Sequence, residues 1–239
     1  MHRTIEPTIL YFGTPVALIS TLNPDGSPNL APMSSAWWLG WSCMLGLGQM
    51  GQTSENLIRT RECVINLPSA DLVSNVDRLA LTTGRDPVPE KKRQWGYRYE
   101  PNKFEVAGFT RAQSDSVAPP RVLECPIQME GVVHDYRSFG KNVSANAFEI
   151  HVVKLHVEES LLTGDGQRPH IDPVRWHPLI MSFLPLLCRG RRGAPIPAGQ
   201  FRLHEICFSG TTCSTRQLHA VAAPSVQNES TLIFLSLCE

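Results

Sequence analysis

The sequence of 239 residues lacks a long hydrophobic run and lacks an excess of charge of either sign. No apolar stretch reaches the roughly 20 residues of a membrane-spanning helix, which excludes a helical membrane protein. Lysine plus arginine and aspartate plus glutamate both number 22, so the formal net charge is zero. A neutral chain has no general electrostatic attraction for nucleic acid or an anionic membrane. A small ligand that carries phosphate is still compatible, since it needs only a local site.

Paired cysteine motifs are also missing. None of the seven cysteines forms a Cys-x-x-Cys pair; they are Cys43, Cys63, Cys125, Cys188, Cys207, Cys213 and Cys238. Residues 1–8 lack the apolar segment of a signal peptide. Because the number of cysteines is odd and no secretion signal is visible, we expect reduced thiols and a cytoplasmic protein.

Signatures of several enzyme classes are absent. The histidines have no metal-ligand spacing, so we predict no metal site. No Gly-x-Ser-x-Gly motif is present, and Gly46-x-Gly48 lacks the third glycine of a dinucleotide-binding fold. His151 and His156 lie in a strand-like segment, where we interpret lone histidines as packing residues.

Strand-like segments dominate the first three quarters of the chain. Residues 16–22 and 28–33 flank the turn sequence Asn23-Pro24-Asp25-Gly26-Ser27, which predicts a hairpin. Further strands are expected over residues 37–47, 63–67, 127–136 and 147–158. Many strands without βαβ alternation predict a mainly β protein, an antiparallel barrel with peripheral helices.

Three short helices are expected around this barrel. One covers residues 55–61, with Thr53 or Ser54 as its N-cap. A second carries Leu72, Val76 and Leu79 at helical spacing, and a third covers residues 90–95.

Two regions depart from the barrel pattern. Residues 81–120 are rich in proline, glycine and charge, and we interpret them as a helical and loop insert, a lid or a cover for a dimer. Residues 184–239 contain four of the seven cysteines and no periodicity. They predict an irregular C-terminal extension, or alternatively an ordered arm that wraps a partner subunit. We therefore assign residues 1–183 to the barrel domain.

Four blocks, taken in order, resemble a known family. They are Gly13-Thr14-Pro15-Val16-Ala17-Leu18-Ile19-Ser20-Thr21, Asn29-Leu30-Ala31-Pro32-Met33-Ser34-Ser35-Ala36-Trp37-Trp38, Thr53-x-x-Asn56-Leu57 and Cys63-Val64-Ile65-Asn66-Leu67. This order resembles the flavin reductase-like, FMN-binding split-barrel family, including its flavoredoxin branch, over residues 7–182. The resemblance implies an antiparallel split β-barrel and a homodimer with FMN bound near the subunit interface.

The resemblance also implies which residues bind FMN. They are Asn29, Ala31, Pro32, Met33, Ser34, Ser35, Gln52, Thr53, Ser54 and Asn56. The block over residues 31–35 is expected at the isoalloxazine ring, where Pro32 interrupts a strand ladder and makes room for a ligand. The glycine-containing loop over residues 48–54 leads into a helix N-terminus, which suits a phosphate. This loop carries Gln49 and Gln52, where the family often has Lys or Arg.

The expected function follows from the cofactor. Bound FMN would pass electrons from NADH, NADPH or a reduced protein to a small molecule, so we expect an FMN-dependent oxidoreductase. Family members that use NAD(P)H commonly carry Gly-Asp-His before the last long strand, and residues 144–151 lack it, so no catalytic residue is assigned. Two alternatives stay open. One is a non-enzymatic flavin electron carrier, and the other is a barrel that has lost FMN and binds another ligand, such as haem, in secondary metabolism.

Overall fold

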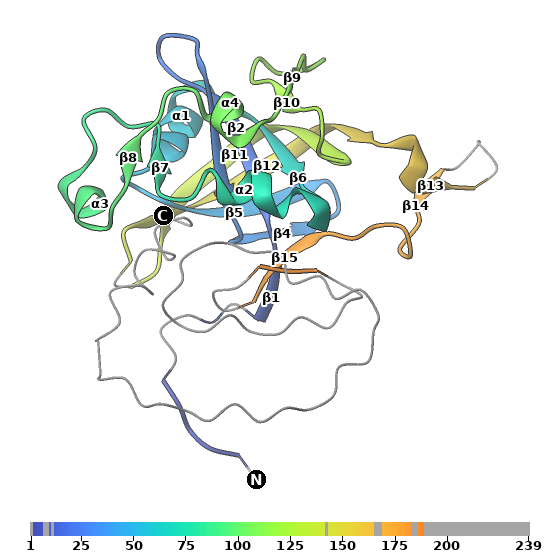
Figure 1. Cartoon of the computed structure of the whole chain (residues 1–239), viewed down its shortest axis with the longest axis horizontal. Helices are drawn as coiled ribbons and strands as arrows, with labels where there is room; N and C mark the ends of the chain where they lie inside the picture. Colours follow the sequence, from blue (N-terminus) through green and yellow to red (C-terminus); the bar gives the residue numbers. More distant parts are fainter. Residues whose placement is uncertain are drawn as a thin grey trace.

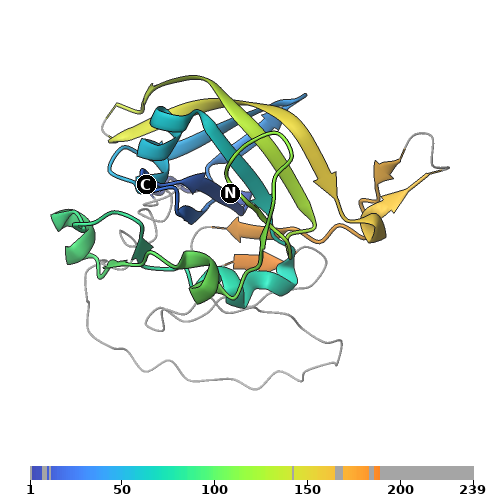
Figure 2. The ribbon, with the colours of Figure 1, turned by 90° about the horizontal axis from the view of Figure 1, so that it is seen from above.

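A seven-stranded antiparallel sheet forms the centre of the molecule. A computed structural model of the protein describes residues 2–6, 10, 12–141, 143–164, 169–182 and 186–188. The sheet has the order β3-β2-β6-β11-β12-β5-β4 and curves around a packed interior (Figures 1 and 2). Its strands are β2 (Ala17–Leu22), β3 (Pro28–Met33), β4 (Ala36–Leu39), β5 (Ser42–Gly48), β6 (Glu62–Leu67), β11 (Ile127–Phe139) and β12 (Ala145–Val157). The predicted mainly β, antiparallel architecture is confirmed.

Alternating side chains give the sheet two buried faces. Successive residues of a strand point to opposite faces, so Ile19 packs into the barrel interior while its neighbour Leu18 packs outside it. Inside, Ile19 joins Phe148 and other side chains that are fully buried. Outside, Leu18 meets Phe104 and the residues of two short helices. This second core attaches the insert to the barrel.

Shorter elements surround the sheet. The helical ones are α1 (Gln52–Thr60), η1 (Ala70–Leu72), α2 (Val73–Asp77), α3 (Glu90–Gln94), α4 (Lys103–Ala107) and η2 (Glu159–Leu161). The strands are β1 (Phe12–Pro15), β7 (Thr82–Thr83), β8 (Arg98–Tyr99), β9 (Arg111–Ala112), β10 (Arg121–Val122), β13 (Leu162–Thr163), β14 (His170–Ile171), β15 (Leu179–Ser182) and β16 (Leu186–Cys188). Among the residues described, no helix has the length and apolar character needed to span a bilayer.

Two local predictions were wrong. The segment predicted as one strand over residues 37–47 is a hairpin of β4 and β5, because Gly40 takes a φ of 59° and reverses the chain. The helix predicted to begin after a Thr53 or Ser54 cap begins at Gln52, with Gly51 as its N-cap. The predicted irregular extension over residues 184–239 lies outside the described residues, apart from β16.

The later part of the insert and β10, which follows it, are tied to the barrel by two buried side chains. Asn66 donates to Leu18 O (3.0 Å) and accepts a hydrogen bond from Val122 N (2.8 Å). The carboxylate of Glu130 accepts from Asp115 N (2.9 Å) and Ser116 N (2.5 Å). Burial opposes ionisation of Glu130, but these N–H groups and His156 outweigh it and lower its pKa below the ordinary value. The insert is therefore packed against the barrel, along one side of it (Figure 2).

Candidate functional site

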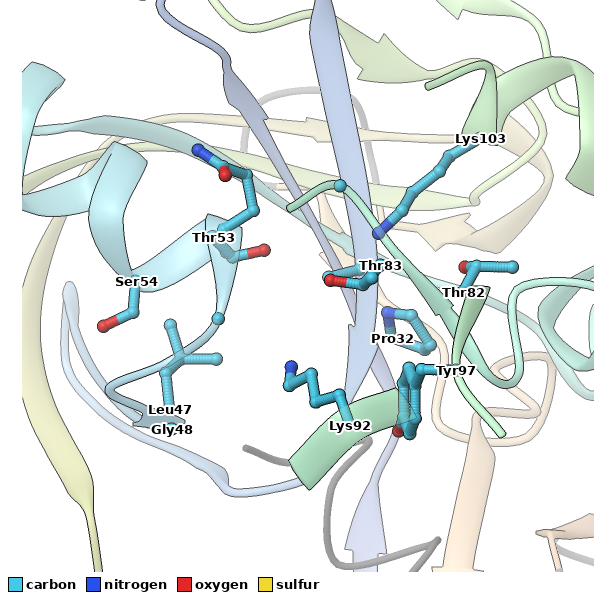
Figure 3. A pocket seen from close by; sticks show the side chains of 14 residues that line it. Pro32, Leu47, Gly48, Thr53, Ser54, Thr82, Thr83, Lys92, Tyr97 and Lys103 are labelled. Atoms are coloured by element: carbon cyan, nitrogen blue, oxygen red, sulfur yellow. The ribbon is translucent and has the colours of Figure 1, made fainter. Parts of the chain in front are cut away.

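A pocket lies where α1 and the ends of β3 and β5 meet the insert (Figure 3). Three stretches on the barrel side and four of the insert supply its walls. The lining residues are Ala31, Pro32, Leu47, Gly48, Gly51, Gln52, Thr53, Ser54, Thr82, Thr83, Gly84, Lys92, Tyr97 and Lys103. Segments more than 50 residues apart in the sequence thus line one site.

The N-terminus of α1 forms one wall. The first hydrogen bond within the helix runs from Glu55 N to Gly51 O (3.2 Å), and Gly51 has no side chain that could cap it. Within the described chain, no acceptor takes the N–H groups of Gln52, Thr53 and Ser54. Exposed N–H groups at the positive end of a helix dipole are a favourable setting for an anion.

Two lysines from the insert face this helix end. Lys92 of α3 and Lys103 of α4 are each 4% exposed, and Figure 3 shows both ammonium groups directed into the pocket. Lys92 Nζ lies 5.3 Å from the centre of the Tyr97 ring. Lys103 makes no hydrogen bond or ion pair with any residue that the structure describes. Burial, reinforced by the charge of Lys92 and only partly opposed by that of Glu100, lowers the pKa of Lys103 to about 7.

This electrostatic arrangement selects for a negative ligand. A buried ammonium without a counter-ion is costly, because the protein interior solvates charge poorly. An anion with several oxygens can bridge the lysines and the helix N–H groups at once. The pocket therefore has the donor set of a phosphate site, and Lys92 and Lys103 supply the cations that the loop over residues 48–54 lacks.

Asn29 orients the helix end toward the pocket. Its Nδ2 donates to Thr53 Oγ1 (2.9 Å) and Thr21 Oγ1 (3.3 Å). Because Thr53 Oγ1 accepts this bond, its own hydroxyl proton is available to a ligand. Asn29 Oδ1 is buried and has no hydrogen-bond donor in the described part of the chain, and it faces Gly84. A buried acceptor oxygen without a donor requires a partner, and a donor group of a ligand or a water molecule would satisfy it.

We expect Gly84→Ala to damage the site. A Cβ at this position would lie 2.5 Å from Asn29 Oδ1 and 3.3 Å from Gln52 Cγ. The Asn29 amide would have to move, which disturbs its hydrogen bond to Thr53. Overpacking of this kind costs about 1–3 kcal/mol. Urea unfolding of the ligand-free variant should show that loss, and wild-type stability would contradict the packing described here.

Asn56 supports α1 and does not line the pocket. Its Nδ2 donates to Thr21 Oγ1 (3.0 Å) and Asn23 Oδ1 (3.0 Å), while its Oδ1 accepts from Gln52 Nε2 (3.0 Å). Every polar atom of this fully buried amide is thus engaged within the protein. Asn56 fixes the helix to the first hairpin, which positions the ligand-facing first turn.

Asn56→Ala should therefore lower stability more than its lack of pocket contact suggests. Losing this network leaves buried partners unsatisfied, and we expect a loss of about 2–4 kcal/mol in the free energy of unfolding. Chemical denaturation followed by circular dichroism measures it. A loss below about 0.5 kcal/mol, the size of an ordinary surface substitution, would show that the network is not structural.

The structure brings together half of the site residues predicted from the sequence. Five of the ten line the pocket: Ala31, Pro32, Gln52, Thr53 and Ser54. Asn29 and Asn56 do not line the pocket, but they hydrogen-bond to the lining residues Thr53 and Gln52. Met33 packs in the barrel interior, Ser34 Oγ donates to Met181 Sδ (3.2 Å), and Ser35 O accepts from Gly46 N (2.8 Å). These last three are not among the lining residues, and their contact with a flavin ring stays a prediction.

The insert supplies part of the pocket wall through residues that were not predicted individually. Residues 81–120 were expected to form a lid or a cover for a dimer, and the structure places six of them in the wall: Thr82, Thr83, Gly84, Lys92, Tyr97 and Lys103. Lys92 stands between two other basic residues, Lys91 and Arg93. Which of the three faces inward depends on the rotation of a short helix about its axis, and the sequence does not indicate that rotation.

A second polar cluster joins the later part of the insert to β11 and β12. Asp115, Glu130 and His156 bring potential metal-ligating atoms within 4.8 Å of one another. Their ligand atoms already serve internal bonds, because His156 Nε2 contacts Glu130 Oε1 (2.7 Å) and Asp115 pairs with Lys154 (2.5 Å). We interpret the cluster as a structural one that holds the loop after β9 against β11 and β12.

The comparison with known proteins identifies the family. Residues 9–181 match the family described as the flavin reductase like domain. The chain belongs to this family. YdfE, an uncharacterized protein of Bacillus subtilis (strain 168), is 42% identical over 181 residues, which cover 76% of this chain and 86% of YdfE. This similarity supports membership of the family but does not indicate which reaction the chain performs.

Solved structures confirm the fold of this flavin reductase-like chain. Flavoredoxin of Desulfovibrio vulgaris (Miyazaki F) superposes with a TM-score of 0.63 at 20% identity, over 83% of this chain and 99% of flavoredoxin. The 2-nitrobenzoate 2-nitroreductase NbaA of Pseudomonas fluorescens gives 0.60 at 19% identity, over 78% and 86% of the two chains. Likeness at this identity shows a shared split β-barrel, as the resemblance implied. Family membership supports a flavin-related redox function.

Proposed function

We propose that the pocket binds FMN and that the protein is an FMN-dependent oxidoreductase. The observation that carries this proposal is the buried ammonium of Lys103, whose burial outweighs the attraction of Glu100 and which faces the uncapped N-terminus of α1 in a family of flavin-linked proteins. A bound flavin would supply the electron-transfer chemistry, so the protein needs no acid or base of its own to begin it.

The phosphate end of the site is assigned to specific groups. The N–H groups of Gln52, Thr53 and Ser54 and the hydroxyl of Thr53 donate to the phosphate oxygens. Lys92 and Lys103 neutralise its two charges. Ala31 and Pro32, on the β3 side of the pocket, lead toward the predicted ring-binding block over residues 31–35.

A homodimer belongs to this proposal. Trp37, Leu39 and Trp41 are 57%, 76% and 58% exposed on the hairpin of β4 and β5, at one edge of the large sheet. Large apolar side chains gathered at an exposed edge indicate an interface. We propose that a second copy of the chain covers this hairpin, which lies directly after the ring-binding block in the sequence.

Leu39→Glu should convert the dimer to a monomer. A buried, unpaired carboxylate at an interface costs several kcal/mol, which is enough to shift a micromolar dimer fully to monomer. Sedimentation equilibrium measures the mass, and Val174→Glu, at an equally exposed site of 76%, is the control. A wild-type monomer, or a Leu39→Glu dimer as tight as wild type, would rule out this interface.

The electron donor is proposed to be NADH, NADPH or a reduced protein, and the acceptor a small molecule. In the segment where family members that use NAD(P)H carry Gly-Asp-His, the structure places Asn146 beside the pocket. Its Oδ1 accepts from Gln49 Nε2 (3.0 Å), and its Nδ2 lies 3.5 Å from Ser54 Oγ. A neutral amide at this place favours the alternative of a flavin electron carrier. We also infer a cytoplasmic location, where the buried thiols of Cys43 and Cys63 would stay reduced.

An anaerobic titration separates these functions. The purified protein is loaded with FMN, and its visible spectrum is followed while NADH or NADPH is added. Bleaching of the flavin band within seconds supports an oxidoreductase that takes electrons from nicotinamide. Bound flavin that responds only to dithionite supports the carrier. Failure to bind FMN would end both proposals and favour the barrel that has lost its flavin.

A further inference from the structure

Lysine is scarce in this protein, and two of its lysines lie inside the pocket. The lysines of the chain are Lys91, Lys92, Lys103, Lys141 and Lys154. Lys91, Lys141 and Lys154 are exposed. Lys92 and Lys103 are each 4% exposed and direct their ammonium groups into the pocket (Figure 3). A reagent must therefore enter the pocket before it can contact either of these two amines.

Lys103 differs from an ordinary lysine in its chemistry. An exposed lysine is almost wholly protonated at neutral pH, and an ammonium group has no lone pair with which to attack. Burial of Lys103 and the positive charge of Lys92 lower its pKa to about 7, and Glu100 opposes this shift only in part. A large share of Lys103 side chains therefore carries the free amine near neutrality. A desolvated lysine beside another cation is a suitable nucleophile for a carbonyl carbon.

The buried thiols of the described chain do not compete with this amine. Cys43, Cys63 and Cys125 are buried, and burial raises the pKa of each thiol. The thiols therefore stay protonated near neutrality, whereas the reactive form of cysteine is the thiolate. None of these three cysteines is among the residues that line the pocket.

The groups around Lys103 select the kind of molecule that can reach it. The N–H groups at the start of α1 and the ammonium of Lys92 favour an anion with several oxygens, such as a phosphate monoester. A molecule bound by its phosphate is held in the same pocket as Lys103. If that molecule also carries an aldehyde, the aldehyde and the amine react within one complex. Holding two reactants together in this way accelerates their reaction.

We propose that Lys103 is a covalent modification site for aldehydes that carry a phosphate group. The amine nitrogen adds to the aldehyde carbon, both N–H protons leave with the aldehyde oxygen as water, and a C=N bond remains. This imine needs no oxidant or reductant, and water reverses it. The modified lysine would block the phosphate end of the pocket and so exclude FMN. The proposal rests on the phosphate site proposed above, but it does not require FMN to be the ligand of that site.

The test uses pyridoxal 5′-phosphate as the probe. Its matched control is 5-deoxypyridoxal, which has the same aldehyde and ring but no phosphate. Each compound is mixed in equal amount with the full-length protein near neutral pH, and the imine is followed by its visible absorption. Borohydride then reduces the imine to a stable amine, and peptide mapping shows which lysine carries the label.

We expect pyridoxal 5′-phosphate to label Lys103 at least about tenfold faster than any exposed lysine, and at least about tenfold faster than 5-deoxypyridoxal does. Lys103→Met should abolish this label, whereas Lys91→Met, at an exposed position outside the pocket, should keep it. Lys92→Met should slow the labelling, because the pKa of Lys103 rises when the neighbouring charge is removed. Inorganic phosphate, added first, should protect Lys103.

Three results would overturn the proposal: a label spread evenly over the lysines, a label on Lys92 in place of Lys103, or equal labelling by the two aldehydes. These results come from the wild-type protein, so they do not depend on whether a variant folds. A titration with FMN judges the flavin site separately. If FMN does not bind but Lys103 is labelled and phosphate protects it, the flavin proposal fails and the modification site stands. If FMN binds and Lys103 is not labelled, the modification site fails alone.

Discussion

Replacing Lys103 with methionine is expected to weaken FMN binding by about 100-fold and to stabilise the ligand-free protein. Losing one partner of a buried charge pair costs about 2–5 kcal/mol, and each 1.4 kcal/mol is a factor of about ten in affinity. In the ligand-free protein the same substitution is expected to be stabilising. The ammonium of Lys103 is 4% exposed, and the attraction of Glu100 does not offset its burial, so an apolar side chain of similar length removes a cost. We expect the free energy of unfolding to rise by about 1–3 kcal/mol.

A substitution that weakens ligand binding but stabilises the ligand-free protein is specific to a ligand site. Fluorescence quenching gives the affinity, and urea unfolding without ligand gives the stability. Lys91→Met is the matched control, because Lys91 is exposed and lies over the Trp95 ring, outside the pocket. A Lys103→Met protein that is less stable and binds FMN as wild type does would show that Lys103 is structural.

FMN affinity is also expected to fall as the pH rises above about 7. Burial lowers the pKa of Lys103 to about 7 in the free protein, and a phosphate dianion beside the amine raises it again. Binding above neutrality must therefore take up a proton. The affinity should drop by up to about tenfold per pH unit between about pH 7 and 9. Below about pH 6 the phosphate itself becomes protonated, so the affinity should be highest near neutrality.

Calorimetry at pH 8 in two buffers with different ionisation enthalpies measures this proton uptake. In Lys103→Met the decline above neutrality should flatten. The ligand-free protein should behave in the opposite way and gain stability as the pH rises from about 7 toward 10.5, because only the unfolded lysine stays protonated there. An affinity that is constant from pH 7 to 9 would exclude a neutral Lys103 in the free site.

The strands could be predicted from the sequence because each one is a local pattern. The turn at Asn23-Pro24-Asp25-Gly26-Ser27 and the apolar residues around it are sufficient for the first hairpin. Residues 37–47 show the limit of this reasoning. Their apolar character continues through Gly40 and Trp41, so only the backbone geometry of Gly40 reveals two strands. The sheet order, with β11 between β6 and β12, depends on long-range pairing that no local pattern encodes.

The site was predictable only on the barrel side. Ala31, Pro32 and the first turn of α1 lie within one segment whose residue order resembles the family. Lys92 and Lys103 come from five-residue helices, and one turn of helix is too short for a hydrophobic period to show which side faces inward. Their burial depends on packing of the insert against the barrel. The missing cation in the loop over residues 48–54 was visible in the sequence, but its replacement was not.

The preference for FMN over riboflavin tests the central claim most directly. The two molecules differ only in the phosphate, so the ratio of their affinities isolates the contribution of the helix end and the two lysines. We predict that wild type binds FMN at least about 100-fold more tightly than riboflavin at pH 7, a difference of about 2.7 kcal/mol. Equal affinities for FMN and riboflavin would contradict a phosphate site in this pocket.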